Sequence, residues 1–323
     1  MIAGKEAVLG LVGVVFLSSG CAGPPRSAAL PADLQQPIVV RPEARTPIAA
    51  GPSRANAATP PAAEVRAAAA ETVAPAVAVA SAVQLPDEPT ARLRALYRMA
   101  DERYATIDSY IARVRRREQA NGKAKPEEVF LFKYRKQPLS VYFKWIGTEG
   151  HGREVVYVQG QHGNKIHTLL AAGDMPLAPA GQRLAVAPDS IFVRNASRHS
   201  ITEAGIGHII ANYGKLLDAL DRGDPKAGTV RCLGSVKRPE FETPLEGIER
   251  TIPPNVDPDV PRGGRRLCMF DIAARLPVLV ITLDAAGNEV DYYCYDRLQF
   301  PVKLNDDDFD PDKLWPAPAK SGK

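Results

Sequence analysis

The chain has 323 residues, of which 45% are hydrophobic and 24% charged, and its net charge is +4. This is the composition of a globular protein with room for one or two domains. The charge excess is too small to indicate a nucleic-acid partner. The sequence contains no G-x-S-x-G elbow, H-E-x-x-H motif, Walker loop or dinucleotide glycine fingerprint. We therefore predict a protein with no catalytic residues, no metal and no cofactor.

The first twenty residues indicate export. Lys5 precedes an apolar run from Ala7 to Leu17. That run is too short for a membrane-spanning helix, which needs about 20 residues. We therefore predict a signal peptide over residues 1–20 rather than a membrane anchor.

The residues around Cys21 resemble the lipobox of bacterial lipoproteins, although Ser18 stands where that pattern usually has leucine. The resemblance implies that Cys21 is lipidated and anchors the protein to a membrane. Ala22 after the cysteine implies a periplasm-facing position on the outer membrane. The alternative is an ordinary secretory signal with a chance cysteine.

Residues 21–89 are rich in alanine and proline and contain almost no large apolar side chains. Such a segment cannot bury a core, so we predict a disordered tether. The folded domain is expected over residues 90–312, with a disordered tail over residues 313–323.

Hydrophobic periodicity predicts an α+β domain. Apolar residues from Leu93 to Ile107 recur at helical spacing and predict a first helix. Alternating patterns predict about ten strands, with a looser segment over residues 171–198. The predicted strands are residues 110–118, 129–136, 139–145, 153–159, 165–170, 229–236, 245–252, 266–272, 276–284 and 289–298.

A second helix divides the strands into two groups. Ser200 and Glu203 match a capping box, so we expect the helix to begin there and to stop near Gly223. Its apolar stripe must be covered by a sheet. We therefore predict nine or ten strands in a strongly curved antiparallel sheet, an incomplete barrel with helices on its concave side. The stripe consists of Ile206, Ile209, Ile210, Tyr213, Leu217 and Leu220.

Several patterns resemble the bacterial domain of unknown function 1571 (DUF1571). They are Tyr134–Trp145, Gly152–Gly160, Arg198–Gly205 (RHSITEAG), and Leu276-Pro277-Val278 followed by Asp284, Gly287, Tyr293, Tyr295 and Asp308-Phe309-Asp310. That family is similar to the lipoprotein carriers LolA and LolB. The resemblance implies an open half-barrel with an apolar cavity that accepts acyl chains.

Two readings of the apolar residues remain open. One face of a predicted strand carries Leu139, Val141, Phe143 and Trp145, which either pack in the core or line a cavity. The stripe of the second helix either closes the cavity or lines it. The candidate cavity residues are Ile206, Ile209, Ile210, Tyr213, Leu217, Phe143 and Trp145.

The central block Arg198, His199, Ser200 and Glu203 is predicted to be structural. Glu203 and His208 are five residues apart, which does not place them on one helical face as metal ligands. Arg198 and His199 are expected to anchor the start of the helix against the sheet.

Acidic residues 306–312 lack the glycine and closing glutamate of a calcium loop. Phe309 is expected to pack this segment onto the sheet while its aspartates stay solvated.

If Cys21 is lipidated, three cysteines remain for an oxidising compartment. We predict a disulfide between Cys232 and Cys268, with Cys294 unpaired. A catalytic cysteine is the weaker alternative, because Cys268 lies in an apolar strand.

Taken together, the sequence predicts a non-catalytic lipoprotein of the outer membrane that binds a lipid, a lipoprotein or another apolar ligand. The alternative is a tethered protein-interaction or envelope-sensing module without a lipid ligand. The sequence does not indicate an oligomeric state.

Overall fold

The computed structural model describes residues 84–120 and 123–316, all within one compact unit. Residues 1–20, Cys21 and the tether up to residue 83 lie outside the described residues. Among the described residues, no helix is long and apolar enough to cross a membrane. The domain begins slightly earlier than residue 90, because Leu85 already packs against the core.

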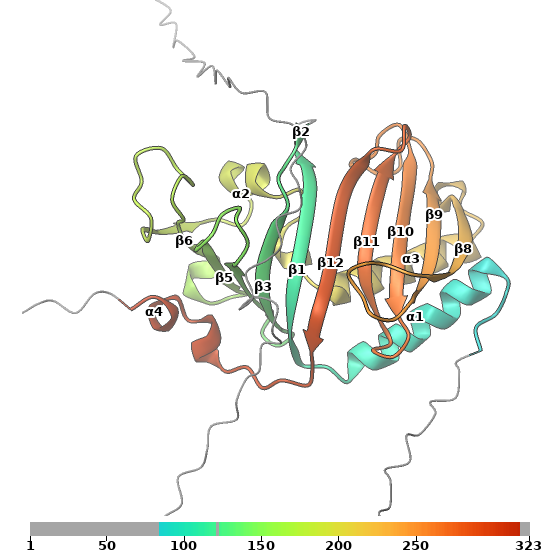
Figure 1. The fold of residues 1–323 in the computed structure, drawn as a ribbon, viewed down its shortest axis with the longest axis horizontal. Coiled ribbons are helices and arrows are strands. Elements are labelled where there is room, and N and C mark those ends of the chain that lie inside the picture. Colours follow the sequence, from blue (N-terminus) through green and yellow to red (C-terminus); the bar gives the residue numbers. More distant parts are fainter. Residues whose placement is uncertain (1–83, 121–122, 317–323) are drawn as a thin grey trace, which may run out of the picture. The chain divides into compact units, whose positions relative to one another are not determined.

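All strands of the described chain form one antiparallel sheet (Figure 1). Its order is β7-β6-β5-β4-β3-β1-β12-β11-β10-β9-β8, and β2 pairs with β1 alone. The two end strands, β7 and β8, do not pair with each other, so the sheet is open as predicted. The strands are β1 (Ser109–Ala120), β2 (Lys123–Ala124), β3 (Glu128–Arg135), β4 (Ser140–Trp145), β5 (Glu154–Val158), β6 (Ile166–Leu169), β7 (Arg183–Val186), β8 (Thr229–Val236), β9 (Leu245–Ile252), β10 (Gly264–Asp271), β11 (Leu276–Asp284) and β12 (Glu289–Gln299).

The sheet has twelve strands rather than the predicted nine or ten. All ten predicted strands are present, and their ends differ from the prediction by at most two residues. The additional strands are β2, between the predicted strands 110–118 and 129–136, and β7, inside the segment predicted to be irregular. Both are short, so neither displays enough alternation to be recognised from sequence.

The sheet consists of two antiparallel meanders joined in the middle. We call β3–β7 the N-terminal half and β8–β11 the C-terminal half. Strands β1 and β12 lie between them and pair with each other, Val114 opposite Tyr295 and Glu118 opposite Asp291. Residues distant in sequence therefore meet at this seam.

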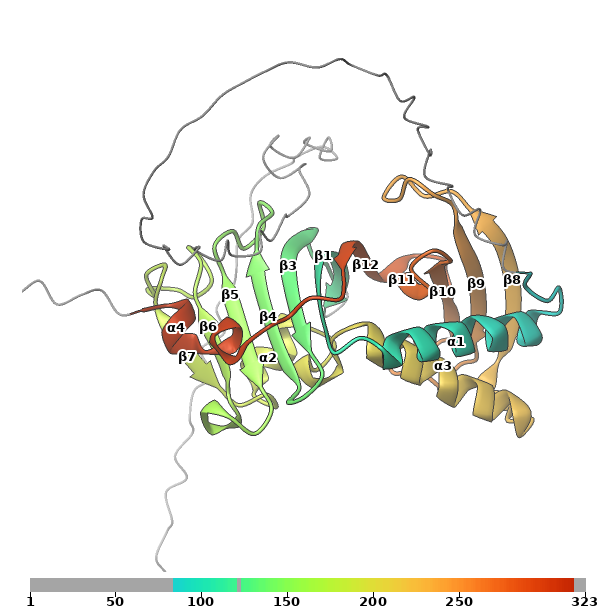
Figure 2. The same cartoon turned by 90° about the horizontal axis from the view of Figure 1, so that it is seen from below.

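Two long helices cover one face of the C-terminal half. Helix α1 (Pro89–Ala105) packs on α3 (Ile206–Asp221) and on β8 and β11. Figure 2 shows the two helices side by side along these strands. The buried side chains between helices and sheet include Leu93, Leu96, Ala100, Ile206, Ile210 and Leu217. The predicted need for a sheet to cover the apolar stripe is thus met.

Helix α3 begins at Ile206 and not at Ser200, so the capping-box prediction was wrong for this helix. Ser200 instead caps the 3₁₀ turn η3 (Ile201–Glu203), where its Oγ accepts a hydrogen bond from the Thr202 amide. The physical reason is Gly205, whose φ of 101° reorients the chain between the turn and the helix.

The start of α3 is fixed by tyrosines. The buried hydroxyl of Tyr110 accepts a hydrogen bond from the Ile206 amide at 2.9 Å. A Cβ at Gly205 would lie 2.5 Å from the same hydroxyl, and one at Gly207 would clash with the Tyr104 hydroxyl. The glycines of the RHSITEAGIG block therefore allow the helix to approach the sheet closely.

The segment between β6 and α3 contains short elements only. Helix α2 (Ile191–Ala196) begins after Ser190, whose Oγ accepts a hydrogen bond from the Val193 amide. Two 3₁₀ turns, η2 (His162–Asn164) and η4 (Pro225–Ala227), lie at the ends of β5 and α3.

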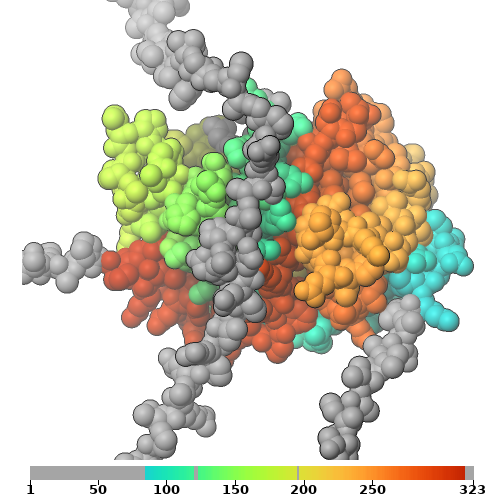
Figure 3. Space-filling view, in the orientation of Figure 1, coloured from blue at the N-terminus to red at the C-terminus, as the bar shows by residue number. Residues whose placement is uncertain are grey.

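The C-terminal segment packs on the opposite face of the N-terminal half, across β4 and β5. It contains η5 (Asp306–Phe309) and α4 (Pro311–Leu314), and Figure 3 shows it in red against the green strands. Phe309 and Trp315 are buried beside Tyr142. Trp315 Nε1 donates a hydrogen bond to Glu154 Oε2 at 2.6 Å. The predicted packing of Phe309 is confirmed.

The predicted boundary of the disordered tail was wrong, because Trp315, beyond residue 312, is a core residue. The aspartates are not merely solvated either. Asp308 pairs with Lys133 and Asp306 with Arg135, each at 2.7 Å.

The predicted disulfide is absent, because Cys232 and Cys268 are both unbonded. They face Ile248 from opposite sides, so one strand lies between them. Residues two strands apart are separated by roughly 10 Å, beyond the reach of a disulfide. Burial raises the pKa of the Cys268 thiol to about 12, so this thiol is protonated at neutral pH.

Candidate functional site

A cavity of about 730 Å³ lies on the helix-bearing face of the sheet. Its wall is formed mainly by β1 and the N-terminal half, and none of the described lining residues comes from α1. Ligand pockets of proteins typically measure roughly 300–1,000 Å³. The wall is largely apolar and includes Phe130, Phe132, Phe143, Trp145, Val155, Ile166, Leu184 and Val186.

The aromatic side chains of the wall pack on one another across neighbouring strands. Phe132 stacks on Phe143, with ring centroids 5.1 Å apart, and Phe130 lies 5.2 Å from Trp145. These pairs follow directly from the register, in which Phe132 is opposite Phe143 and Phe130 opposite Trp145. Phe143 and Trp145 thus pack on neighbouring rings and border the cavity, whereas Val141 is buried in the core.

Helix α3 separates the cavity from the core of the C-terminal half. Of the predicted cavity residues on this helix, Ile209 and Tyr213 lie in the lining of the cavity. Ile206, Ile210 and Leu217 do not line it, because they are buried between α3 and the sheet. The stripe is therefore divided between the cavity lining and the core beneath α3.

Apolar side chains are exposed at the rim. Phe192 of α2 is 63% exposed and lines the cavity entrance together with Val193 and Met175. Its neighbour Ile191 is 56% exposed. Large apolar side chains in contact with water at the mouth of a cavity are typical of a binding surface.

Charged side chains lie beside the aromatic residues of the wall, around Glu128. Trp145 Nε1 donates to Glu128 Oε1 at 2.9 Å, and Arg116 pairs with the other oxygen of the same carboxylate. Arg153 lies over the Trp145 ring, 5.0 Å from its centroid, and pairs with Asp174. These contacts fix the position of the Trp145 ring, and both oxygens of the Glu128 carboxylate accept hydrogen bonds.

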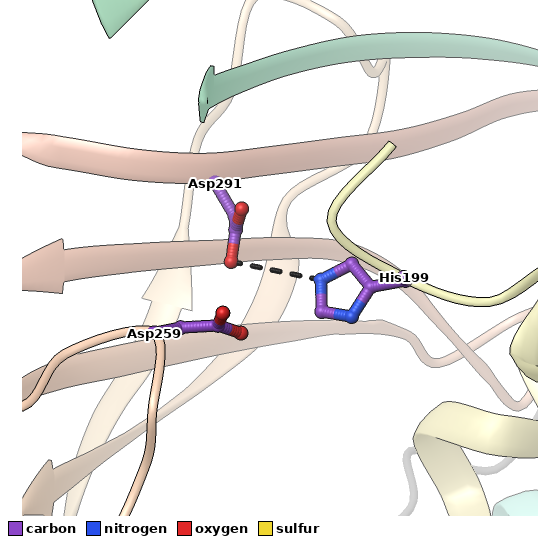
Figure 4. A group of neighbouring side chains, drawn as sticks. All are labelled: His199, Asp259 and Asp291. Atoms are coloured by element: carbon purple, nitrogen blue, oxygen red, sulfur yellow. Dashed lines mark ion pairs between the residues drawn. The ribbon is translucent and has the colours of Figure 1, made fainter. Parts of the chain in front are cut away.

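A second polar group lies at the seam of the sheet, where His199, Asp259 and Asp291 face one another (Figure 4). His199 Nε2 is 3.8 Å from Asp291 Oδ2. Burial would lower the pKa of His199, but the neighbouring charge of Asp291 outweighs it and raises that pKa. All three residues border the cavity.

Arg198 orders this group. Its Nη2 donates to Asp259 Oδ1 at 2.6 Å, and its Nε lies 3.4 Å from Asp291 Oδ1. Its Nη1 donates to the Gln119 carbonyl at 2.8 Å. Arg198 and His199 thus anchor the segment before η3 to the sheet. Ser200 and Glu203 also border the cavity, but Glu203 is exposed and outside the His199 group.

Glu118 adds a third carboxylate near the seam. It stands directly opposite Asp291, and both are buried, at 3% and 2% exposure. Tyr293 donates its hydroxyl hydrogen to Glu118 Oε1. Glu118 Oε2 and Asp291 Oδ1 have no hydrogen-bond donor among the described residues. Sequence reasoning missed Glu118, Asp259 and Asp291, because no local motif joins three segments so far apart in the chain.

Comparisons with known proteins identify the family. The chain belongs to the family described as protein of unknown function DUF1571, whose model matches residues 107–314, and the resemblance stated from the sequence is confirmed. A search of curated proteins found no match.

The chain is also similar to solved structures, all at low identity. An uncharacterized conserved protein from Thermus thermophilus has 9% identity and a TM-score of 0.38, covering 67% of this chain and 91% of that one. The Mycobacterium tuberculosis lipoprotein LppX has 13% identity and a TM-score of 0.38, covering 66% and 98%. A LolA superfamily protein from Nitrosomonas europaea has 13% identity and a TM-score of 0.27, covering 68% and 98%.

Proposed function

We propose that this member of the DUF1571 family binds a lipid or another elongated apolar molecule in the cavity beside α3. The observation that carries the proposal is the cavity itself, about 730 Å³ with an aromatic and aliphatic wall. A lipid acyl chain gains roughly 0.8 kcal/mol for each methylene that it buries. The apolar wall is therefore suited to an acyl chain.

The rim supports the same ligand class. Phe192 and Ile191 are exposed beside the entrance. An acyl chain that enters from a membrane or from a lipidated protein would meet apolar side chains before it reaches the interior. The apolar wall itself comes mainly from strands, while α2, α3 and loops complete the lining.

We place this activity in the cell envelope, without catalysis. Support comes from the apolar run and Cys21 at the start of the sequence, which predict an exported, lipid-anchored protein. The cell-envelope location and the anchor at the outer membrane are parts of the proposal.

The test is displacement of a fluorescent fatty acid from the delipidated full chain by palmitate. We expect saturable binding of one probe per chain. Thr168→Trp places a large side chain in the cavity and should weaken binding at least tenfold. His167→Trp is the matched control, because residue 167 lies on the other face of the same strand and outside the lining.

Two results would contradict lipid binding. One is no saturable binding of the probe by the wild-type chain. The other is equal affinity of Thr168→Trp and His167→Trp. If crosslinking in intact cells then captured a reproducible protein partner, the tethered interaction module would replace our proposal.

A further inference from the structure

We propose that His199, Asp259 and Asp291 form a binding site for a divalent transition-metal ion. Each residue offers one ligand atom, and these atoms all lie within 4.8 Å of one another. They come from three segments: the turn before η3, the loop between β9 and β10, and strand β12. Figure 4 shows the imidazole and both carboxylates directed toward one space.

The buried carboxylates provide a second, independent observation. Glu118 and Asp291 stand opposite each other across β1 and β12 at 3% and 2% exposure. Like charges directly opposite in a sheet are destabilising, and a buried charge without a partner is costly. Each of the two has an oxygen without a hydrogen-bond donor among the described residues. A cation bound beside these two carboxylates would reduce the repulsion between them.

The nearby arginines supply only part of the positive charge. Arg198 is 2.6 Å from Asp259 and 3.4 Å from Asp291. Arg116 is 4.0 Å from Glu118, but its closer partner is Glu128. Among the described residues, Arg198 is the one guanidinium within 3.5 Å of Glu118, Asp259 or Asp291. Three carboxylates therefore face fewer close cations than negative charges, and a divalent ion would neutralise the remainder.

Arg198 also positions the ligands. It contacts Oδ1 of Asp259 and lies near Oδ1 of Asp291, while Asp291 Oδ2 is directed toward His199 Nε2. Asp259 Oδ1 accepts a hydrogen bond from Arg198, whereas Asp291 Oδ1 lies 3.4 Å from Arg198 Nε without forming one. The oxygen of Asp291 offered to the metal is Oδ2, 3.8 Å from His199 Nε2. Arg198 is therefore a positioning residue rather than a ligand.

The donor set indicates the class of metal. One imidazole nitrogen with two carboxylate oxygens suits Zn²⁺ and similar ions, bound at roughly 2.0–2.2 Å. Calcium requires six to eight oxygens, which this group does not offer. The three ligands must move together by about 1 Å or less, and His199, with a 38% exposed side chain, has room to do so. The remaining coordination position would face the cavity.

The test is calorimetric titration of the full chain, purified without a polyhistidine tag and treated with chelator, using Zn²⁺ alone as the probe. We expect one ion per chain. His199→Ala and Asp259→Asn should each weaken binding at least tenfold, and Zn²⁺ should raise the melting temperature of the wild type but not of these variants. His208→Ala is the matched control, because His208 also lines the cavity but is outside the group.

The proposal fails if the chelator-treated wild type takes up no Zn²⁺. It fails equally if the folded His199→Ala/Asp259→Asn double variant keeps wild-type affinity, because the ion would then be bound elsewhere. Neither result bears on lipid binding, since the fatty-acid assay is run on metal-free protein. Conversely, failure to bind fatty acid would leave the metal proposal intact, because His199, Asp259 and Asp291 are still present.

Discussion

The two halves of the sheet have similar strands but different cover. Over β8–β11, helices α1 and α3 lie against the sheet and fill its face with Leu93, Leu96 and Ile210. Over β3–β7, the cover consists of short α2 and irregular segments, and a cavity remains. The apolar strand pattern is common to both halves. A cavity thus arises where helical cover is missing, not where the strands differ.

Helix α3 packs on the C-terminal half with one side and borders the cavity with the other. Truncating side chains on the two sides should therefore change the free energy of unfolding by different amounts. Ile210→Ala removes a side chain that is 4% exposed in the covered half and should lower the free energy of unfolding by about 3 kcal/mol. Ile209→Ala, at the edge of the cavity, should cost about 1 kcal/mol or less. Urea denaturation measures both values. Equal losses would mean that the cavity side is packed as tightly as the covered side.

The second prediction concerns the point where α3 meets the seam. Gly205→Ala combines a φ of 101° with a Cβ that would lie 2.5 Å from Tyr110 Oη, so we expect a loss of about 2 kcal/mol or more. Gly160→Ala is the control, since its φ is 76° but nothing lies within 4 Å, and about 1 kcal/mol is expected. Thermal denaturation would distinguish them. A Gly205→Ala variant as stable as Gly160→Ala would show that the tyrosine contact is unimportant.

The third and smallest effect is confined to the cavity half. Glu154 is buried, which alone would raise its pKa, but hydrogen bonds from Trp315 and Tyr142 outweigh burial and lower that pKa below 4.5. A carboxyl whose pKa is lower in the folded state stabilises the fold above its unfolded pKa, and this contribution is lost as pH falls through the folded pKa. Glu154→Gln should therefore cost about 1 kcal/mol at pH 7 and progressively less below pH 4.5.

Denaturation of both proteins at several pH values tests this prediction. Exposed Glu242→Gln serves as the control for the loss of one carboxylate, because Glu242 lies outside this hydrogen-bond network. Hydrogen exchange should further show that Glu154→Gln loosens β4 and β5 while β9–β11 are unaffected. A pH-independent difference between wild type and Glu154→Gln would contradict the role assigned to the carboxylate.

The sequence predicted what local periodicity controls. The ten main strands and both long helices follow from patterns within single segments, and Phe309 packs as its apolar character suggested. The predicted helix start at Ser200 was wrong. A local capping pattern cannot reveal that Tyr110, in strand β1, accepts the hydrogen bond from the Ile206 amide where the helix begins. The proposed disulfide failed for a similar reason, since β9 separates the two cysteines.

The polar group at the seam was beyond sequence reasoning. Glu118 and Asp291 become neighbours only through the register of β1 and β12, and Asp259 reaches them from an irregular loop. His199 was identified as a polar anchor, but its carboxylate neighbours were not. Its aspartate partners depend on tertiary contacts that no spacing rule encodes.

The pairing of β1 with β12 also determines the order in which strands can pair during folding. Val114 pairs with Tyr295, 181 positions later, so β1 waits for almost the whole domain before its second neighbour exists. At a synthesis rate of about 5–20 residues per second, the delay is roughly 10–35 s. An unpaired strand edge invites association with other chains, and charged side chains suppress it. Arg113 and Arg117, which later pair with Asp296 and Glu289, place such charges on β1 during that interval.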